Sequence, residues 1–333
     1  MYNFCTLFNS LYLSRALVMY NSLVKTGAKF HLYIFTMDDR SYETLLKLYL
    51  KDVTVISLKE FENKELLTVK PLRTAGEYCW TCTPSTILYC IEKYTLDNCT
   101  YIDADLYFFK DPSLLIEEMR DNSVLITDHR YTAAYDTSLK YGKYCVQFIT
   151  FKNDVNGMEV LRWWTDACIK WCYNRAEDNK FGDQKYLDDW KDRFKGVHEL
   201  QHLGGGVAPW NIQQYKVEKK EGKLIGIEKK TGKKFDVIFY HFHNYKYCTN
   251  NGFHTGHYQI DRESLQIFYE SYIKALHDAD TLLEDINGVG IFHELLPIPR
   301  VNKSLRRMLL YNLLGKFDNY YKYKYIVKDG SLN

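Results

Sequence analysis

Residues 101–109 of this 333-residue chain read Tyr-Ile-Asp-Ala-Asp-Leu-Tyr-Phe-Phe, so that two carboxylates, Asp103 and Asp105, interrupt an apolar run. The run predicts a buried strand over residues 98–103. A buried carboxylate is unfavourable unless a cation or hydrogen-bond donors compensate its charge. Hard Mg²⁺ or Mn²⁺ prefers carboxylate oxygen and often shares its ligand shell with substrate phosphates. The motif therefore predicts a metal site for a phosphate-bearing substrate, and a pair of solvated aspartates on an edge strand is the alternative.

Strands and helices are expected to alternate around this segment. Apolar runs predict strands over residues 2–8, 30–36, 53–57, 124–127 and 146–151, and helical spacing predicts helices over 14–24, 39–50, 84–94 and 158–172. Ser14 and Pro84 are expected at the first turns of their helices. This alternation favours an α/β fold with a mostly parallel central sheet flanked by helices. Ligands of such sheets bind at the carboxyl ends of strands, where Asp103 and Asp105 lie.

The second half of the chain has a different pattern of expected secondary structure. We expect a short helix over residues 182–190, a β-meander over 216–240 with turns at Gly222 and Gly232, and a long helix over 262–285. One domain is expected over residues 1–298, followed by a helical, basic tail over 299–333. The tail carries eight Lys/Arg and two Asp/Glu, a net charge of +6, which leaves −4 for the first 298 residues.

The net charge and the amino-acid composition exclude several classes of protein. A net charge of +2 indicates no general attraction to nucleic acid, and 46% hydrophobic with 26% charged residues is an ordinary globular composition. The nine cysteines, with no signal-peptide pattern and no apolar stretch of membrane-spanning length, favour a reducing cytoplasmic location. Cys79 and Cys82 have the spacing of a redox pair or of half a zinc site with Cys168 and Cys172, but apolar core positions are favoured for them.

The basic tail suggests contact with a membrane surface. Its residues 303–314 present apolar side chains at helical spacing beside two arginines, and 320–325 alternate tyrosine with lysine. Basic and interfacial aromatic residues of this kind suit peripheral attachment to the inner face of an anionic membrane, here through residues 303–328. The alternative is a helix that packs on the domain with a solvated basic face.

A second polar cluster follows the apolar residues 237–240. His241 and His243 point to one face if the segment is extended, so one of them could complete a site of histidine and carboxylates. Lys246 follows at a distance that suits a phosphate. The alternative is a pair of hydrogen-bonded histidines without a metal.

Two further clusters place carboxylates near expected strand or helix ends. Gly182 allows close approach of the backbone before Asp183 and Gln184, a pair that suits sugar hydroxyls, although a helix N-terminus also favours Asp. Asp128 follows the strand over 124–127 directly, and polar residues at such strand exits gather in binding sites.

Residues 204–211 read Gly-Gly-Gly-Val-Ala-Pro-Trp-Asn and suggest a loop that delivers Trp210 and Asn211 to a pocket, with a simple turn as the alternative. No Gly-Lys-Ser/Thr follows, which argues against a P-loop, and no Gly-x-Gly-x-x-Gly follows the first strand. A Gly-x-Ser-x-Gly hydrolase motif is also missing from the sequence.

In this order the clusters are similar to those of the GT-A nucleotide-sugar glycosyltransferases, and within them to the retaining galactosyltransferase and glycogenin-like family. Asp103-Ala104-Asp105 matches the Asp-x-Asp motif of that fold. The resemblance spans residues 1 to about 250, although the family's Gly-x-x-Lys-Pro-Trp is here His-Asn-Tyr-Lys-Tyr-Cys and its Asn-Ser-Gly falls within Tyr-Cys-Val-Gln-Phe at 144–148. Four further motifs follow the Asp-x-Asp motif in the family. The strand-end Asp corresponds here to Asp128, and the Asp-Gln pair to Asp183 with Gln184. The Trp-Asn pair corresponds to Trp210 with Asn211, and the metal-binding His with its downstream Lys to His241 with Lys246.

The resemblance implies a hexosyltransferase that uses Mn²⁺ or Mg²⁺ and a nucleoside diphosphate sugar, with a UDP-linked donor and a retaining mechanism favoured and with a glycan or lipid-linked acceptor. Its implied site comprises the metal ligands Asp103, Asp105 and His241 (His243 as the alternative), the catalytic residues Asp128, Asp183 and Gln184, the donor contacts Thr6, Phe8, Asn9, Tyr12, Asp103 and Lys246, and the acceptor contacts Trp210 and Asn211.

Two other functions stay open at this point. A nucleotidyltransferase that makes a nucleotide sugar would share the fold, but residues 9–15 contain no glycine, whereas such enzymes usually carry a Gly-rich basic loop there. A non-enzymatic carbohydrate-binding protein would also explain the aromatic content of 16%.

Overall fold

Side chains of the central strands alternate between two buried cores. In the computed structural model, which describes residues 1–249, 251–288, 290, 292–297 and 319–327, β1 (Tyr2–Phe8) pairs in parallel with β2 (Phe30–Thr36). Phe4 and Phe8 lie in one core, whereas Cys5 and Leu7 lie in the other. Because successive side chains of a strand point to opposite faces, the sheet needs helices on both sides.

The central sheet has seven strands in the order β3-β2-β1-β4-β7-β6-β8. Only β7 runs antiparallel to its neighbours, and the other pairs are parallel. The predicted α/β fold with a mostly parallel sheet is therefore confirmed. The strands not yet named are β3 (Val53–Ile56), β4 (Asn98–Ile102), β6 (Val124–Asp128), β7 (Tyr144–Lys152) and β8 (Val197–Glu199).

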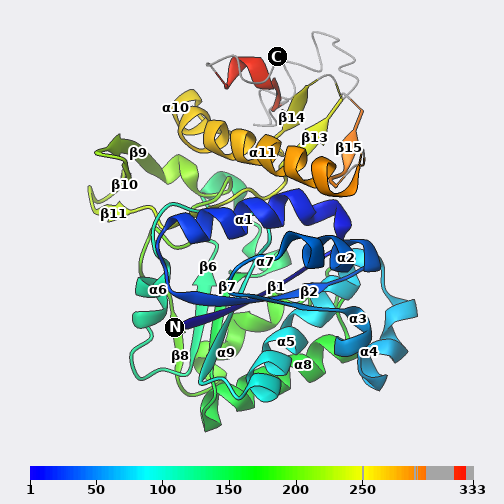
Figure 1. Cartoon of the computed structure of the whole chain (residues 1–333). Coiled ribbons are helices and arrows are strands. Elements are labelled where there is room, and N and C mark those ends of the chain that lie inside the picture. The colour runs from blue at the N-terminus through cyan, green and yellow to red at the C-terminus, as the bar shows by residue number, and fades with distance from the viewer. Residues whose placement is uncertain (250, 289, 291, 298–318, 328–333) are drawn as a thin grey trace.

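Helices cover both faces of this sheet. Figure 1 shows α1 (Leu13–Lys25) and α11 (Glu270–Asn287) on one side and α5 (Ala75–Tyr94) and α8 (Val155–Lys170) on the other. The shorter α-helices are α2 (Asp39–Leu48), α3 (Leu58–Phe61), α4 (Lys64–Val69), α6 (Ser113–Glu117), α7 (Ser138–Tyr141), α9 (Trp190–Arg193) and α10 (Arg262–Ser264). The short 3-10 helices span Ser10–Tyr12, Lys70–Leu72, Ala133–Tyr135, Lys185–Asp189, Ile212–Gln214 and Tyr323–Tyr325.

Two predicted helix starts are wrong. α5 begins at Ala75 rather than Pro84, because Thr74 and Glu77 form a capping box that satisfies the first backbone N–H groups. α1 begins at Leu13, so Ser14 lies inside the helix and its hydroxyl donates to Asp280 on α11 instead of capping.

The predicted meander is present but ends earlier than expected. β9 (Tyr215–Lys220), β10 (Lys223–Glu228) and β11 (Lys234–Asp236) form an antiparallel sheet whose turns contain Gly222 and Gly232, both with positive φ. The expectation that residues 237–240 end this meander is wrong. Instead, β12 (Phe239–His241) pairs with β5 (Leu106–Phe108), and the ring of Phe239 packs on those of Phe108 and Phe148.

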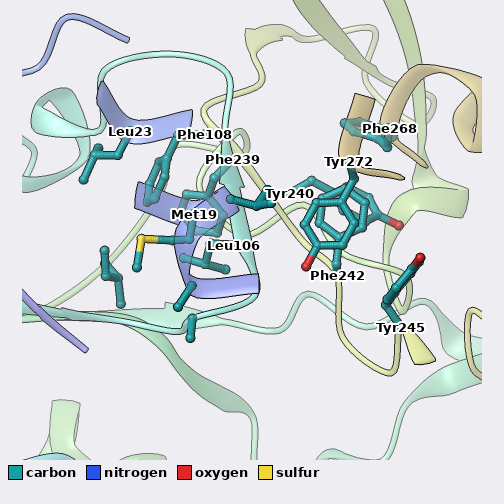
Figure 2. Close-up of a cluster of buried hydrophobic side chains, with 14 of the residues drawn as sticks. Met19, Leu23, Leu106, Phe108, Phe239, Tyr240, Phe242, Tyr245, Phe268 and Tyr272 are labelled. Atoms are coloured by element: carbon teal, nitrogen blue, oxygen red, sulfur yellow. The ribbon is translucent and has the colours of Figure 1, made fainter. Parts of the chain in front are cut away.

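The predicted long helix is confirmed as a continuous segment of α10, a π-helical turn (Leu265–Tyr269) and α11. It packs on a small sheet in the order β15-β13-β14-β16, formed by β13 (Lys246–Cys248), β14 (Gly252–His254), β15 (Leu295–Leu296) and β16 (Tyr320–Lys322). Figure 2 shows part of the shared core, in which aromatic residues from β12, the following loop and the long helix stack against one another.

The described part of the predicted tail lies on the domain. β16 pairs with β14, and the ring of Tyr323 stacks on that of Phe253. The predicted tail helix over residues 303–314, with Leu305, Arg306, Arg307, Met308, Leu309 and Leu313, lies outside the described residues. Among the described residues, no helix has both the length and the apolar character needed to cross a bilayer.

Candidate metal and substrate site

The paired aspartates lie directly after β4, at the carboxyl end of the central sheet. The N–H of Asp103 donates to the carbonyl of Gln147 on β7 across 3.1 Å, which fixes the backbone at the strand exit. Burial raises the pKa of Asp103 to about 6, and the charge of Asp105 acts in the same direction. Burial alone would also raise the pKa of Asp105, but the charge and hydrogen bond of His241 hold it below its ordinary value. The partly exposed Asp103 and the buried Asp105 thus share one cationic partner.

His241 reaches the aspartates because β12 pairs with β5, which begins at the residue after Asp105. Its Nε2 lies 3.0 Å from Asp105 Oδ1 and 3.7 Å from Asp103 Oδ2, and its side chain is 5% exposed. The ligand atoms of these three residues lie within 4.8 Å of one another. His243 does not join this group, and its ring centre lies 5.6 Å from that of His241.

Gln147 determines which nitrogen of His241 faces the carboxylates. Gln147 is fully buried on β7, and its Oε1 lies 2.7 Å from His241 Nδ1. An amide oxygen only accepts, so Nδ1 carries a proton and Nε2 is the atom left for a ligand or a second proton. From the sequence, Gln147 was apparent only as part of a departure from the family pattern. Its position inside the buried run over 144–151 was the available signal.

This donor set fits a hard or borderline divalent cation. Two carboxylates and one imidazole suit Mn²⁺ or Mg²⁺, and the hydrogen bond from the outer nitrogen of a ligating histidine is the usual support of such sites. Two buried polar atoms of nearby strands, Gln147 Nε2 and Thr6 Oγ1, have no hydrogen-bond partner among the described residues. Unpaired buried polar atoms of this kind are expected where a ligand or water belongs.

Asp183 is buried and lies within electrostatic range of Asp103. Burial and, to a smaller extent, the charge of Asp103 raise the pKa of Asp183 to about 7, although a hydrogen bond with the Thr83 hydroxyl opposes both. Gly182 precedes it with φ +52, and a Cβ there would lie 3.3 Å from the ring of Trp80. Gln184 is half-buried, and its amide donates to the Tyr141 carbonyl across 2.7 Å.

Asp128 ends β6, two strands away from β4 in the sheet. Its Oδ1 accepts the Arg130 N–H across 2.7 Å, and its Oδ2 lies 3.4 Å from Lys143 Nζ. Both oxygens therefore have partners. The guanidinium of Arg130 donates to the carbonyls of Leu200, His202, Leu203 and Gly205, which lie in the segment between β8 and Trp210, here called the glycine loop.

Trp210 and Asn211 are buried rather than exposed on a pocket wall. The Trp210 Nε1 and Asn211 Nδ2 atoms both donate to the carbonyl of His129 across 2.8 Å, and Asn211 also bonds to Gly206 and Ala208. The Trp210 ring packs edge-on against His241, with 5.3 Å between ring centres. These two residues hold the glycine loop against the histidine.

The predicted donor-binding residues of the N-terminal segment fall into two groups. Thr6 and Phe8 are buried on β1, and Asn9 accepts the N–H of Leu11 as a helix cap. Tyr12 is 38% exposed. Its ring lies over the guanidinium of Arg15, a buried residue that the sequence analysis did not select as a site residue. Lys246 begins β13 and is exposed.

The cysteines do not form the zinc site that their spacing allowed. No group of three or more metal-binding side chains among the described residues includes Cys79, Cys82, Cys168 or Cys172, and burial raises the pKa of Cys79 to about 12. A different set, the buried Cys5, Cys90 and Cys99, does converge, with thiols within 4.8 Å of one another in one of the two cores.

Comparison with known proteins gives relatives of uncharacterised function. The uncharacterised protein YfnD of Bacillus subtilis (strain 168) is 32% identical over 283 residues, which cover 82% of this chain and 88% of YfnD. YfnF of the same strain is 30% identical over 299 residues, which cover 86% of this chain and 96% of YfnF. No family model matches the chain.

Solved structures of glycosyltransferases show a limited likeness. The galactosyltransferase LgtC in complex with donor and acceptor sugar analogues is 10% identical, with a TM-score of 0.48 and coverage of 83% of this chain and 95% of LgtC. The glycosyltransferase GlyE of Streptococcus pneumoniae TIGR4 is 15% identical, with a TM-score of 0.40, and the match covers 64% of this chain and about half of GlyE, 48%. With scores below 0.5, these similarities assign no activity to this chain.

Proposed function

This chain belongs to the protein family of YfnD and YfnF of Bacillus subtilis, and we propose that it is a metal-dependent glycosyltransferase that moves a hexose from a nucleoside diphosphate sugar to a glycan or lipid-linked acceptor. The observation that carries the proposal is the convergence of Asp103, Asp105 and His241 at the carboxyl end of a mostly parallel sheet. A UDP-linked donor is favoured by the sequence resemblance.

The proposed metal ligands are Asp105, Asp103 and His241 Nε2. A divalent cation bound there would supply Lewis-acid stabilisation of the departing diphosphate. His241 is oriented for this role by Gln147, which occupies its other nitrogen. Lys246 begins β13, shortly after His241, and is exposed, so its ammonium group would be able to approach a phosphate and stabilise developing negative charge.

Asp183 and Gln184 would hold the donor sugar next to the metal ligands. The proximity of the Asp183 and Asp103 charges supports a place beside the leaving group. Because both oxygens of Asp128 already have a backbone or ammonium partner, a binding role suits Asp128 better than that of a general base. This supports a retaining reaction, in which the leaving phosphate accepts the proton of the acceptor hydroxyl. An inverting reaction would use Asp128 as the base.

The base of the donor is placed next to the N-terminal segment. The partly exposed ring of Tyr12 would offer a stacking surface, and Asn9 caps the 3-10 helix that carries it, while Thr6 and Phe8 are buried on the preceding strand. Trp210 and Asn211 would influence the acceptor indirectly, because the loop that they hold packs against His241.

A product-release screen tests the proposed reaction without knowledge of the acceptor. UDP- and GDP-sugars are incubated with the protein and Mn²⁺ or with chelator, and release of the nucleoside diphosphate by slow donor hydrolysis is measured. The proposal expects release that needs Mn²⁺ and one class of donor. Release of pyrophosphate from a nucleoside triphosphate and a sugar phosphate would instead identify a nucleotidyltransferase. Binding of sugars without turnover of any donor would indicate a carbohydrate-binding protein.

A further inference from the structure

Arg15 is a buried cation without an anionic partner. The residue is 3% exposed on α1, yet no carboxylate lies within ion-pair distance of its guanidinium among the described residues. Its NH1 donates to the Leu11 carbonyl across 3.2 Å, and its NH2 donates to the Tyr245 carbonyl across 3.1 Å. A guanidinium offers five N–H donors, so three remain without a protein partner in the described part of the chain. Burial of a charge in this state is unfavourable unless an anion compensates it.

The groups around Arg15 are also incompletely bonded. The hydroxyls of Tyr247 and Tyr272 are buried and have no hydrogen-bond partner among the described residues. The Tyr247 ring lies 5.2 Å from the Arg15 Cζ atom, and the Tyr272 ring, visible in Figure 2, is held by stacking on Phe242 with 3.6 Å between ring centres. The charge of Arg15 also acts on the Tyr272 hydroxyl, so the three donor groups lie within electrostatic range of one another, without the acceptor that buried donors normally have.

Arg15 also connects the two segments between which a donor would bind. Leu11 belongs to the 3-10 helix after β1, next to Tyr12, and Tyr245 directly precedes Lys246. The charge of Arg15 is one of those that keep the pKa of Asp105 below its ordinary value, so the guanidinium lies within electrostatic range of the aspartate. Its location thus coincides with the expected path from base to metal.

We propose that Arg15, together with the hydroxyls of Tyr247 and Tyr272, binds the diphosphate of the donor nucleotide. This assignment rests on the proposed function, since it names a second anion-binding group of the same site. The diphosphate would take hydrogen bonds from the free N–H groups of Arg15 on one side, while the aspartate-bound cation would hold it on the other. A planar guanidinium suits phosphate oxygens because it donates two parallel hydrogen bonds.

Calorimetric titration with Mn²⁺ present and three probes, UDP, GDP and inorganic pyrophosphate, tests the assignment. Arg15→Met keeps the length of the side chain but removes its charge and donors, and it should weaken both nucleotide and pyrophosphate binding by about 10- to 100-fold. Arg15→Lys restores the charge but not the two parallel N–H donors of the guanidinium, and it should recover part of the lost binding affinity. If Arg15 only positioned the loop that carries Tyr12, nucleotide binding would weaken and pyrophosphate binding would not, which overturns the proposal.

Tyrosine variants keep the test decisive if Arg15→Met does not fold. Tyr272→Phe should weaken pyrophosphate binding by about three- to tenfold. Tyr269→Phe is the matched control, because its hydroxyl is also buried and unpaired, but its charge neighbours are Tyr240, Tyr258 and Tyr321 rather than Arg15. Equal affinities of the two variants would overturn the assignment. A wild-type protein that binds no diphosphate with Mn²⁺ contradicts the proposed function itself, whereas wild-type binding with unchanged variants contradicts only the role of Arg15.

Discussion

The Nδ1 atom of His241 donates a hydrogen bond to Oε1 of Gln147 across 2.7 Å. The bond joins a residue of β12 to one of β7, 94 positions apart in the chain, and both side chains are buried. Its consequence is chemical, because it leaves Nε2 of the imidazole directed at Asp105 and Asp103. The metal site that we propose therefore depends on a residue that touches no metal.

Gln147→Leu should weaken Mn²⁺ binding by about 10- to 100-fold, which is the usual effect of losing the partner of a ligating histidine. The leucine has a similar volume and removes the unpaired Nε2 atom, but it leaves the buried Nδ1–H of His241 without an acceptor, so the free energy of unfolding should fall by about 1–3 kcal/mol. Titration of Mn²⁺ followed by electron paramagnetic resonance measures the affinity. Gln266→Leu, on the distant long helix, is the control and should bind Mn²⁺ as the wild type does. Equal affinity of the Gln147 variant would show that the hydrogen bond does not tune the histidine.

Gly182→Ala should reduce turnover more than stability. The residue has φ +52, and the new Cβ would lie 3.3 Å from Trp80, so the backbone next to Asp183 must shift. A non-glycine residue in this conformation costs about 1–2 kcal/mol. Donor hydrolysis and chemical denaturation measure the two effects.

Gly27→Ala separates the effect of backbone strain at positive φ from the effect of displacing the backbone next to Asp183. Gly27 also has positive φ, +78, but a Cβ there would meet nothing within 4 Å. It should therefore lose a similar free energy of unfolding and keep its activity. A Gly182 variant that lost stability alone, as this control should, would argue against a role of Asp183 in the reaction.

His129 should make the protein sensitive to mild acid. The ring is buried, burial lowers its pKa to about 3, and a hydrogen bond to the Lys143 carbonyl opposes this shift only partly. An unfolded histidine titrates near 6.5. Above about pH 7 both states are neutral and His129 has no effect on the pH dependence. As the pH falls from about 6.5 towards 3, the unfolded state binds a proton that the folded state does not, so stability is lost, by roughly 2 kcal/mol at pH 5.

His129→Asn tests this contribution, because an asparagine amide can donate to the same carbonyl without titrating. The variant should lose less stability than the wild type between pH 7 and pH 5, whatever its stability at pH 7. Urea denaturation at both values measures the difference. Parallel losses in the two proteins would mean that other groups cause the acid sensitivity.

The sheet was predictable because apolar runs of strand length have few other interpretations. The ranges of β1 and β2 were predicted to the residue, and the charge of Asp103 and Asp105 within such a run indicated the strand exit correctly. The start of α5 was missed because Pro84 was taken as a first-turn residue. The Thr74 and Glu77 spacing of a capping box was the better signal.

The site is formed by contacts between residues that lie far apart in the sequence, and patterns in the sequence do not reveal such contacts. Residues 237–240 were assigned to a local meander, whereas β12 pairs with β5, more than 130 positions earlier, and this pairing brings His241 to Asp105. Gln147 and Arg15 were not selected as site residues from the sequence, although both are polar residues within apolar stretches. Their partners, however, come from other strands and loops, so their roles became visible only in three dimensions.

The most direct measurement is calorimetric titration of Mn²⁺ into the wild type, Asp105→Asn and Asp121→Asn, each in the presence and absence of UDP and GDP. We predict that Mn²⁺ and one diphosphate bind the wild type cooperatively, that Asp105→Asn loses at least about 100-fold in Mn²⁺ affinity, and that substitution of the exposed Asp121 has no effect. An Asp105→Asn protein that binds Mn²⁺ and diphosphate as tightly as the wild type would contradict it.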